Sequence, residues 1–574
     1  MVAEVDKILE TWGRMQQEKA VWNTHWQLVH EYVLQRKADF TASRESGAFL
    51  HSEVWTAIPA KAAETAASAL LGMIWPNSNS FKLKPVGELE DDEDAAEWFE
   101  DVSEIIANEL DNPKAGLSLA LGEFFLDLTV SGTPALHLEQ GEESLYQFDA
   151  WNVQQFALDE GAGGNADTFF RCRKYTVRQA VEKFGAEKVS KKTREAFNKQ
   201  RFTDDVEILH VIAPRIVMPN RGGGSKNMPF MSAWIEVSDK HLIKESGYQE
   251  LPTYAMRYSK RIGEKYGRSM AMNALPDIME LNALWEQVTI GLEKNFDPPL
   301  AVWNDGVFGG GTIDTGAGAI NVVNVSGKLP GTRAPIEPLL TVGNFNDVAV
   351  LIERLESTVN DHFMIDRLLD FNNETQMTAR EALMRRALRA SLLHAVNHRA
   401  YTEVFTPMLE RAFNIGLRAG KFGYAAKSPE AIAWQAMNPG REMKEIPDSI
   451  IRMQGKGDRV YTIEYQTPAM REQRAEEAQG VLNLFEALPL IAQVDPSAIN
   501  EVHGGRAVKV LGESWSVPHD VWMTDDEKEA KQQADAQVAQ ENRDMQVSGA
   551  QSEIAKNVAS AQGEIMKGRR EGAA

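Results

Sequence analysis

Hydrophobic residues recur every three or four positions along much of this chain, the spacing that places them on one side of an α-helix. The clearest example follows a Tyr266-Gly267-Arg268-Ser269 turn, and its apolar positions are Leu281, Leu284, Trp285, Val288 and Leu292. Pro276 suits the first turn of a helix, and Pro298-Pro299 prevents a helix from continuing. The pattern therefore predicts one amphipathic helix over residues 274–297.

The same spacing predicts helices on both sides of this one. They cover residues 5–29, 52–75, 88–111, 346–368, 379–416, 467–489 and 496–510. At the start of the helix over 379–416, Thr378 and Glu381 form a capping-box pattern, and Pro407 is expected to kink or split this helix. From Asp525 the chain is polar and has few large apolar residues, so this tail is either helical only on assembly or disordered.

Two regions read instead as β structure. Residues 133–260 alternate apolar and polar positions, with strands expected at 135–138, 145–148, 206–217 and 234–237, and a basic helical patch at 183–199 that is more simply surface than site. Residues 300–340 are glycine-rich with short apolar runs, and they predict a protruding, hairpin-like excursion between two helices. The fold class predicted is α+β, mainly helical.

The charge of the chain limits its partners. There are 83 acidic and 61 basic side chains, a formal net charge of −22, which repels nucleic acid and anionic membranes. A DNA partner would therefore have to slide past without sticking. Residues 88–111 contain twelve acids and no base, and they are read most simply as a solvated helix with one buried face, or else as a repulsive or docking surface.

Compartment and membrane contact can also be anticipated. The single cysteine, Cys172, leaves no possibility of an intrachain disulfide or a multi-cysteine metal site, which fits a reducing compartment. No run of about 18 apolar residues occurs, and the first ten residues carry acids where a signal peptide needs bases. A soluble protein is expected.

No motif of catalysis or cofactor binding is found. No lysine in a Gly-Lys pair is followed by the hydroxyl residue that a phosphate-binding loop requires. His394 and His398 share a helix face, but Ala395 stands where a zinc protease needs glutamate, so a polar helix face is the simpler interpretation. Arg171 and Arg173 could lower the pKa of Cys172, yet no partner pattern supports a nucleophile. We predict no enzyme activity, no cofactor and no metal site.

One segment is basic within this acidic chain. Between Gln376 and Gly420 there are seven arginines and three glutamates, a net charge of +4. The residues singled out are Arg380, Arg385, Arg386 and Arg389. Arginine can bind phosphate through its planar fork, but pairing with acids of a neighbouring subunit is the alternative that the acidic chain favours.

The segment 247–299, with its Tyr266-Gly267-Arg268-Ser269 turn and the PDI…LN helix after it, resembles the head-to-tail connector, or portal, family of short-tailed bacteriophages. The Trp22-x-x-x-Trp26 helix, the MTAREA segment at Met377 and the P-x-LER-x-F segment at Pro407 are similar to the family as well. Val33-Leu34 departs from the proline that the family often places after the tyrosine at this point. The resemblance covers about residues 10–465 and is specific in 247–299 and 363–416.

This resemblance implies a division of the chain. The parts are a wing (1–273), a first stem helix (274–299), a β clip (300–343), a second stem helix (344–368), a tunnel loop (369–377), a long wing helix with its return (378–466), a helical crown (467–524) and a polar tail (525–574). The tunnel loop residues are Asn372, Asn373, Glu374, Thr375 and Gln376, and the clip residues expected to dock partners are Asp305, Gly309, Gly310 and Gly311.

The function that the resemblance implies is that of a ring, a dodecamer in this family, at one capsid vertex. It would be the channel for genome packaging and ejection, with terminase, tail adaptor, major capsid and scaffolding proteins as partners and double-stranded DNA passing through non-specifically. Its place would be the virion, after assembly in the host cytoplasm, with no membrane contact. The alternatives are a soluble DNA-acting hydrolase, which would cleave DNA as a monomer with a divalent cation, and another capsid or tail structural protein, which would form sheets or tubes.

Overall fold

The computed structural model describes residues 2–41, 53–90, 92–141, 143–215, 224–304, 313–324, 336–339, 346–365, 394–425, 428–437, 444–456, 459–467, 480–488, 504–514 and 531. The chain divides into two compact units, Met1–Gln473 and Arg474–Ala574. Helices and sheets are both present, and helices predominate, so the predicted α+β class is confirmed.

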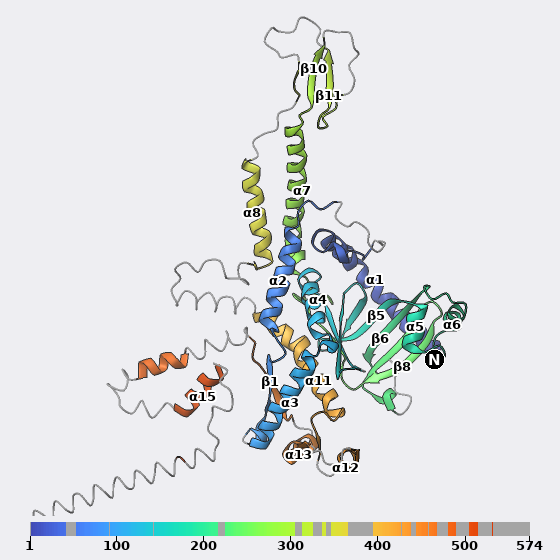
Figure 1. The fold of residues 1–574 in the computed structure, drawn as a ribbon, viewed down its shortest axis with the longest axis vertical. Coiled ribbons are helices and arrows are strands. Elements are labelled where there is room, and N and C mark those ends of the chain that lie inside the picture. The colour runs from blue at the N-terminus through green and yellow to red at the C-terminus, as the bar shows by residue number, and fades with distance from the viewer. Residues whose placement is uncertain are drawn as a thin grey trace, which may run out of the picture. The chain divides into compact units, whose positions relative to one another are not determined.

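The first unit contains most of the helices (Figure 1). They are α1 (Val2–Val33), α2 (Ile58–Ile74), α3 (Glu93–Asp111), α4 (Leu117–Val130), α5 (Val177–Phe184), α6 (Lys191–Asn198), α7 (Met270–Phe296), α8 (Asn346–His362), α11 (Thr406–Arg418), α12 (Pro429–Met437) and α13 (Asp448–Lys456). Short 3-10 turns lie at Gln35–Lys37, Gly87–Leu89, Pro113–Ala115 and Gly224–Asn227.

Several predicted helices are confirmed, with shifted ends. The helix predicted over 88–111 is α3, whose first turn is capped by the Asp92 side chain, and the basic patch 183–199 falls on the end of α5 and on α6. The alanine-rich helix begins at Ile58 rather than at residue 52, with Pro59 in its first turn. The helix expected to reach residue 368 ends at His362, because Met364 adopts a positive φ of 56° that breaks the helical path.

The longest helix that escaped prediction is α4, and the shorter α12 and α13 were not predicted either. Helix α4, with the sequence LSLALGEFFLDLTV, packs against α2 and β3 and has almost every side chain buried in its second half. A helix that is apolar on nearly all sides carries no periodic signal, because no face is left for polar residues. Neighbouring elements bury it on nearly all sides, so its sequence lacks the amphipathic pattern by which a helix is predicted.

The largest sheet is antiparallel, with strand order β4-β5-β6-β7-β8. Its strands are β4 (Phe156–Glu160), β5 (Ala166–Thr176), β6 (Asp205–Pro214), β7 (Phe230–Glu236) and β8 (His241–Tyr248). Successive residues of β6 face opposite ways: Leu209 and Val211 pack with the first half of α1, whereas Val206 and Ile208 pack with α5. This sheet is therefore covered on both faces by helices from its own chain.

Smaller sheets complete the first unit. The hairpin β2 (Ala135–Gln140) and β3 (Tyr146–Trp151) was predicted, and β9 (Thr253–Ala255) pairs with its other edge. Strand β1 (Phe81–Pro85) pairs antiparallel with β15 (Tyr461–Tyr465), and β13 (Tyr424–Ala425) pairs parallel with β14 (Glu445–Ile446). The main hydrophobic core lies among α1 to α4, β2, β3, α7, α8 and α11.

The glycine-rich region 300–340 forms a three-stranded sheet rather than a hairpin. Strand β10 (Leu300–Asn304) lies between β11 (Ile320–Asn324) and β12 (Ile336–Pro338). It pairs parallel with β11 and antiparallel with β12, so the hairpin prediction is wrong for the first pair. A parallel pair needs a crossover connection, which a tight turn cannot provide.

In the second unit the structure describes two helical segments, residues 480–488 and α15 (Gly504–Ser514). The first lies within the helix predicted over 467–489. The second begins inside the one predicted over 496–510 and continues four residues beyond it. Most of the polar tail lies outside the described residues.

Candidate functional site

Helices α7 and α8 pack side by side, with the sheet β10–β12 between them in the chain (Figure 1). The His362 ring lies 3.0 Å from the Asp277 carboxylate and links the two helices near the core. The sheet is anchored to the far end of α7, where Gly318 N–H donates to Asp297 O at 2.8 Å and Leu339 N–H donates to Pro299 O at 2.7 Å. The helix, the β segment and the returning helix, predicted in this order along the chain, therefore also lie next to one another in space.

Helix α7 begins earlier than its prolines suggest. Ser269 caps it by accepting the Met272 N–H at 2.9 Å, so Pro276 lies within the helix rather than in its first turn. The placement predicted for Pro276 is wrong, because the serine of the turn already supplies the cap. Further along, Asn282 binds residues 53–55: its side-chain oxygen accepts the Trp55 N–H at 2.7 Å and its amide donates to Glu53 O.

The Tyr266–Ser269 turn is fixed by a close backbone crossing. A Cβ added to Gly267 would lie 2.6 Å from Gly132 O, and one added to Gly132 would lie 2.6 Å from Gly267 O. The Gly267 N–H donates to the Thr133 hydroxyl at 2.8 Å across the same crossing. Only two glycines allow the chain to pass this closely before it enters α7.

The flanking residues of the turn bind it to α1. Tyr266 is buried and meets Trp26 edge-on, with ring centroids 5.2 Å apart. Burial raises the pKa of its hydroxyl above the ordinary range. Arg268 forms a forked pair with Glu264 and lies over Trp22, 5.5 Å from the ring centroid. The turn therefore positions the base of α7 against the N-terminal helix.

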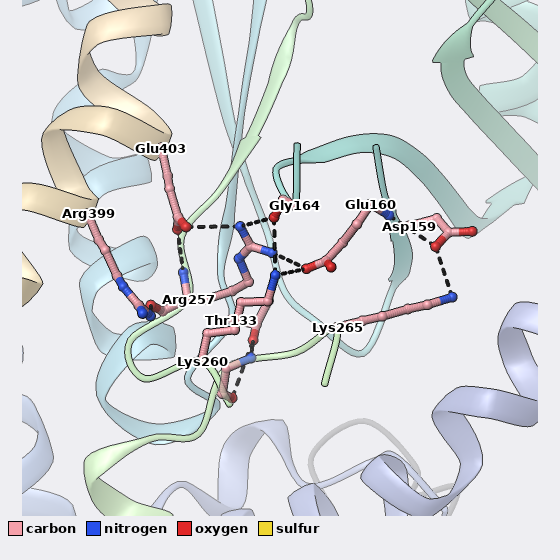
Figure 2. A network of polar contacts seen from close by, with 10 residues as sticks. Thr133, Asp159, Glu160, Gly164, Arg257, Lys260, Lys265, Arg399 and Glu403 are labelled. Atoms are coloured by element: carbon pink, nitrogen blue, oxygen red, sulfur yellow. Dashed lines mark hydrogen bonds and ion pairs between the residues drawn. The ribbon is translucent and has the colours of Figure 1, made fainter. Parts of the chain in front are cut away.

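Beside this turn lies a buried ionic network centred on Arg257, which Figure 2 shows. The guanidinium pairs with Glu160 from β4 and, at 2.9 Å, with Glu403. It also donates to Gly164 O at 3.1 Å, while the Arg257 N–H donates to the second oxygen of Glu403 at 3.0 Å. Lys260 joins Glu160, so one buried cluster holds the large sheet, the approach to α7 and the helix before α11.

Glu403 lies on a π-helical segment, η5 (Ala400–Phe405), just before Pro407. The Thr406 N–H bonds to Tyr401 O, five residues back, which marks a wide turn. The interruption predicted at Pro407 is confirmed, since α11 starts at Thr406 with Pro407 in its first turn. Arg399, the residue before the wide turn, donates to Arg257 O at 3.1 Å, so it binds the same residue as Glu403 within the turn.

The apolar stripe of α7 loses its cover toward the C-terminal end. Leu281 is fully buried, and Leu284, Trp285 and Val288 are partly buried against the core. Leu292 is 37% exposed and Phe296 is 84% exposed. Other large apolar side chains are exposed on the outer half of this pair and its sheet: Ile290, Ile313, Ile320, Val322, Ile336, Val350 and Leu351. The outer half thus presents an apolar surface that the described residues of one chain leave open.

The polar faces of these two helices are acidic. Helix α7 carries Asp277, Glu280, Glu286 and Glu293 against Lys294, and α8 carries Asp347, Glu353, Glu356 and Asp361 against Arg354. Most of these carboxylates are exposed. Such a surface repels the phosphate backbone of DNA.

The site residues predicted from the sequence lie outside the described part of the chain. This holds for Asn372, Asn373, Glu374, Thr375 and Gln376, for Arg380, Arg385, Arg386 and Arg389, and for Asp305, Gly309, Gly310 and Gly311. Of the seven arginines in the basic segment, the remaining three contact their own chain. Arg411 and Arg418 share Glu250, and Arg399 binds Arg257 O, so these three are not free for phosphate or for a neighbour in the way first considered.

Sequence reasoning missed the Arg257 network entirely. Its members, Glu160, Arg257 and Glu403, lie far apart in the sequence. Each is a charged residue of a type that usually lies at the surface, so none of them stands out. One signal was available: Glu403 falls on the predicted helix 379–416 close to Pro407, where helices depart from regular geometry.

The weaker chemical candidates can be followed in the structure. His394 and His398 stack with ring centroids 6.1 Å apart, and no cluster of three potential metal ligands occurs among the described residues. Burial raises the pKa of Cys172 to about 11, so the expectation that flanking arginines could lower it is wrong. No described helix combines the length and the apolar content needed to span a bilayer.

Comparison with known proteins identifies the family. The family model described as "Bacteriophage head to tail connecting protein" matches residues 5–522. The chain belongs to this family. It is a structural family, so the chain has the role of a portal, or connector, protein and its place is the virion.

Two phage proteins are similar along most of their length. The probable portal protein of Bordetella phage BPP-1 is 24% identical over 414 residues, which cover 71% of this chain and 73% of that protein. The portal protein of Salmonella phage epsilon15 is 22% identical over 574 residues, covering 97% of this chain and 96% of that protein. A chain in the neck of a native gene transfer agent particle aligns at 10% identity over 74% of this chain and 86% of its own, but its TM-score of 0.32 is too low to assign a shared fold.

Proposed function

We propose that this connector protein assembles as a closed ring at one capsid vertex, a dodecamer by analogy with its family. In each copy α7 and α8 are the stem helices, β10–β12 the clip, the parts 1–273 and 378–466 the wing, and 467–524 the crown. The ring is the channel through which the genome is packaged and later ejected. The observation that carries the proposal is the progressive exposure of the apolar stripe on α7, from buried Leu281 to Phe296.

An apolar surface of this kind favours association of copies. Contiguous exposed apolar patches are rare on monomers and mark interaction surfaces. The patch on α7, α8 and the sheet includes side chains from three segments, among them Phe296, Ile320 and Val350. When each copy meets the next through two different surfaces, a rotation that closes produces a ring. Covering Phe296 and its neighbours would make the outer half of α7 as buried as the inner half.

The acidic faces of α7 and α8 suit a channel for DNA. Carboxylates such as Glu286, Glu293 and Glu353 would keep a passing duplex in solvent and prevent it from adhering. The tunnel loop, residues 372–376, is proposed to project into this channel. The clip, with Asp305 and Gly309–Gly311, is proposed to dock terminase and later the tail adaptor, while major capsid and scaffolding proteins surround the ring during assembly in the host cytoplasm. The protein is proposed to be a conduit without catalysis of its own.

The mass of the purified protein in solution tests this proposal. Light scattering and negative-stain imaging should show closed rings near a multiple of the 63.9 kDa chain, with a central hole. The double variant Leu292→Ser with Phe296→Ser should lower the ring fraction strongly, because it removes the apolar surface that a neighbour would cover. Val21→Ser with Leu119→Ser, which replaces two exposed apolar side chains elsewhere, is the matched control and should leave rings intact.

Two results would contradict the proposal. A monomer that cleaves DNA in the presence of a divalent cation would favour the hydrolase alternative. Sheets or open tubes without closed rings would favour a different structural role in the capsid or tail.

A further inference from the structure

A basic pocket lies between the large sheet and α11, in a chain that is acidic as a whole. Its volume is about 510 Å³, and its basic side chains are Lys183, Lys188, Lys244, Arg411 and Arg418. Trp234 and Tyr248 add aromatic surface, and Glu139 is the one acid among the residues that line it. We call this feature the basic pocket.

The charge of the basic pocket is only partly compensated. Arg411 and Arg418 share Glu250, at 3.2 and 2.6 Å. Glu139 is held by His137 at 3.1 Å and by the Tyr248 hydroxyl at 2.6 Å. Burial alone would raise the pKa of Glu139, but these two partners outweigh it and keep this pKa far below its usual range. The carboxylate is therefore ionised but already bound.

The three lysines have no such partner. Within the described part of the chain, no carboxylate pairs with Lys183, Lys188 or Lys244, and all three are exposed. The Lys183 ammonium lies 4.3 Å from the centroid of the Trp234 ring, which holds it at the pocket without neutralising it. The pocket thus presents unpaired positive charge beside an aromatic surface, a combination that suits a carboxylate-bearing partner.

Helix α3 presents the opposite charge. Its exposed face carries Glu93, Glu97, Glu100 and Glu104, at steps of four, three and four that align them along the helix. Glu100 pairs with Lys82 at 2.8 Å, whereas no ion pair involves Glu93, Glu97 or Glu104 among the described residues. The other side of α3 is buried through Trp98 and Phe99. We call the exposed row the acidic stripe.

The acidic stripe and the basic pocket lie on opposite sides of α11. Arg411, Ile415 and Arg418 follow each other at steps of four and three, so they share the face of α11 that lines the pocket. Phe413, two positions after Arg411 and so about 200° around the helix, meets Trp98 of α3 with ring centroids 6.2 Å apart. One chain therefore cannot place its own stripe in its own pocket.

We infer that the acidic stripe of α3 in one copy docks into the basic pocket of the next copy around the ring. The inference rests on the proposed ring and specifies one of its contacts. Opposite charges on opposite sides of a subunit produce the head-to-tail contact that a closed ring requires. The three free lysines match the three free glutamates in charge. A nucleic acid is a poorer occupant, since the net charge of −22 repels it.

Charge reversal tests this contact. Lys183→Glu with Lys244→Glu reverses two of the three free lysines of the pocket, and Glu97→Lys with Glu104→Lys reverses two of the three free glutamates of the stripe. Each double variant should lower the ring fraction at low salt by about tenfold or more, because like charges then face each other across the interface. A chain carrying all four substitutions should recover rings, since every interface is again complementary. Lys191→Glu with Lys192→Glu, exposed on nearby α6, is the control with the same change of net charge and should leave the ring fraction unchanged.

A covalent trap adds a measurement that does not depend on ring yield. Cys172 is the one native cysteine, so Lys244→Cys with Glu97→Cys should give an intermolecular disulfide ladder on oxidation, and either single variant should not. Rings that tolerate both reversals at any salt and give no ladder overturn this inference while leaving the proposed ring intact. A wild-type protein that remains monomeric overturns both.

Discussion

Helices α3 and α7 have the same kind of sequence pattern, but they differ in how much of the apolar stripe is buried in the structure. Both are amphipathic, and the stripe of α3, from Trp98 to Leu110, is covered throughout by the same chain. The stripe of α7 is covered only in its first half, and Phe296 at its end is largely exposed. An apolar stripe predicts that a face will be buried, but it does not say which chain will bury it.

The two regions differ in the same way in their polar contacts. Around the base of α7, Arg257, Glu160 and Glu403 pair with one another in the interior. On the outer half of α7 and on α8, the carboxylates are mostly exposed to solvent. The base is completed within one chain, whereas the described residues leave the apolar surface of the outer half uncovered. This contrast makes three predictions about the stability of the isolated subunit.

The largest effect on stability is expected at the base of α7, in the buried Arg257 network. Arg257→Met should lower the free energy of unfolding by about 3–5 kcal/mol, because Glu403 would lose its ion-pair partner in a largely buried site and Glu160 would keep only Lys260. Denaturant unfolding of the subunit measures the loss. Arg14→Met, which removes an exposed arginine 4.0 Å from Asp159, is the control and should change the stability by less than about 1 kcal/mol. Equal losses in both variants would show that the network does not hold the base.

An intermediate effect is expected from pH. His30 of α1 is buried against Ser131, and burial, aided by the charge of Lys37, lowers its pKa from 6.5 to about 3. Between these values the unfolded chain binds the proton and the folded chain does not. Stability from this group is therefore complete above pH about 6.5 and falls as the pH drops toward 3, with a loss of about 2 kcal/mol at pH 5.

The variant His30→Gln isolates this contribution. Its unfolding free energy should fall less between pH 7 and pH 5 than that of the wild type, by about the same 2 kcal/mol. His394→Gln, at an exposed position, should keep the wild-type slope. Parallel curves for wild type and His30→Gln would contradict a neutral buried histidine.

The smallest effect on stability is expected on the outer half of α7, where the apolar side chains are exposed. Leu292→Ser with Phe296→Ser should change the unfolding free energy of the isolated subunit by less than about 1 kcal/mol, since surface substitutions seldom matter more. The same substitutions are expected to lower the ring fraction strongly. A large loss of subunit stability would mean that the chain covers this surface itself, which would remove the distinction between the two halves of α7.

The sequence predicted elements with a strong period and missed those without one. Helices α1, α3 and α7 and the strands β2, β3, β6 and β7 were expected, because alternation or helical spacing records which face is buried. Helix α4 was missed since it is buried on nearly all sides, and the parallel pairing of β10 with β11 was missed since pairing partners are not encoded in local spacing. The start of α7 was misplaced because Pro276 was placed in the first turn, whereas Ser269 caps the helix further upstream.

For the candidate site too, local patterns were predicted from the sequence and contacts between distant segments were not. The Tyr266–Ser269 turn was singled out correctly, but its physical reason, the crossing of Gly132 and Gly267, joins residues far apart in the sequence. The Arg257 network likewise combines residues from three segments, and the basic pocket combines residues from five. The predicted tunnel-loop and clip residues rest on family resemblance and stay predictions.

The wide turn at Ala400–Phe405 has a consequence for the direction in which side chains point. A π turn holds one residue more than an α turn. The side chains before this turn are therefore rotated about the helix axis by about 100° relative to those of α11. That offset aims Arg399 at the Arg257 carbonyl while Arg411 and Arg418 reach Glu250. Deleting the exposed Thr402 would restore an α turn and rotate Arg399 away from the Arg257 carbonyl, although Thr402 takes no part in that hydrogen bond.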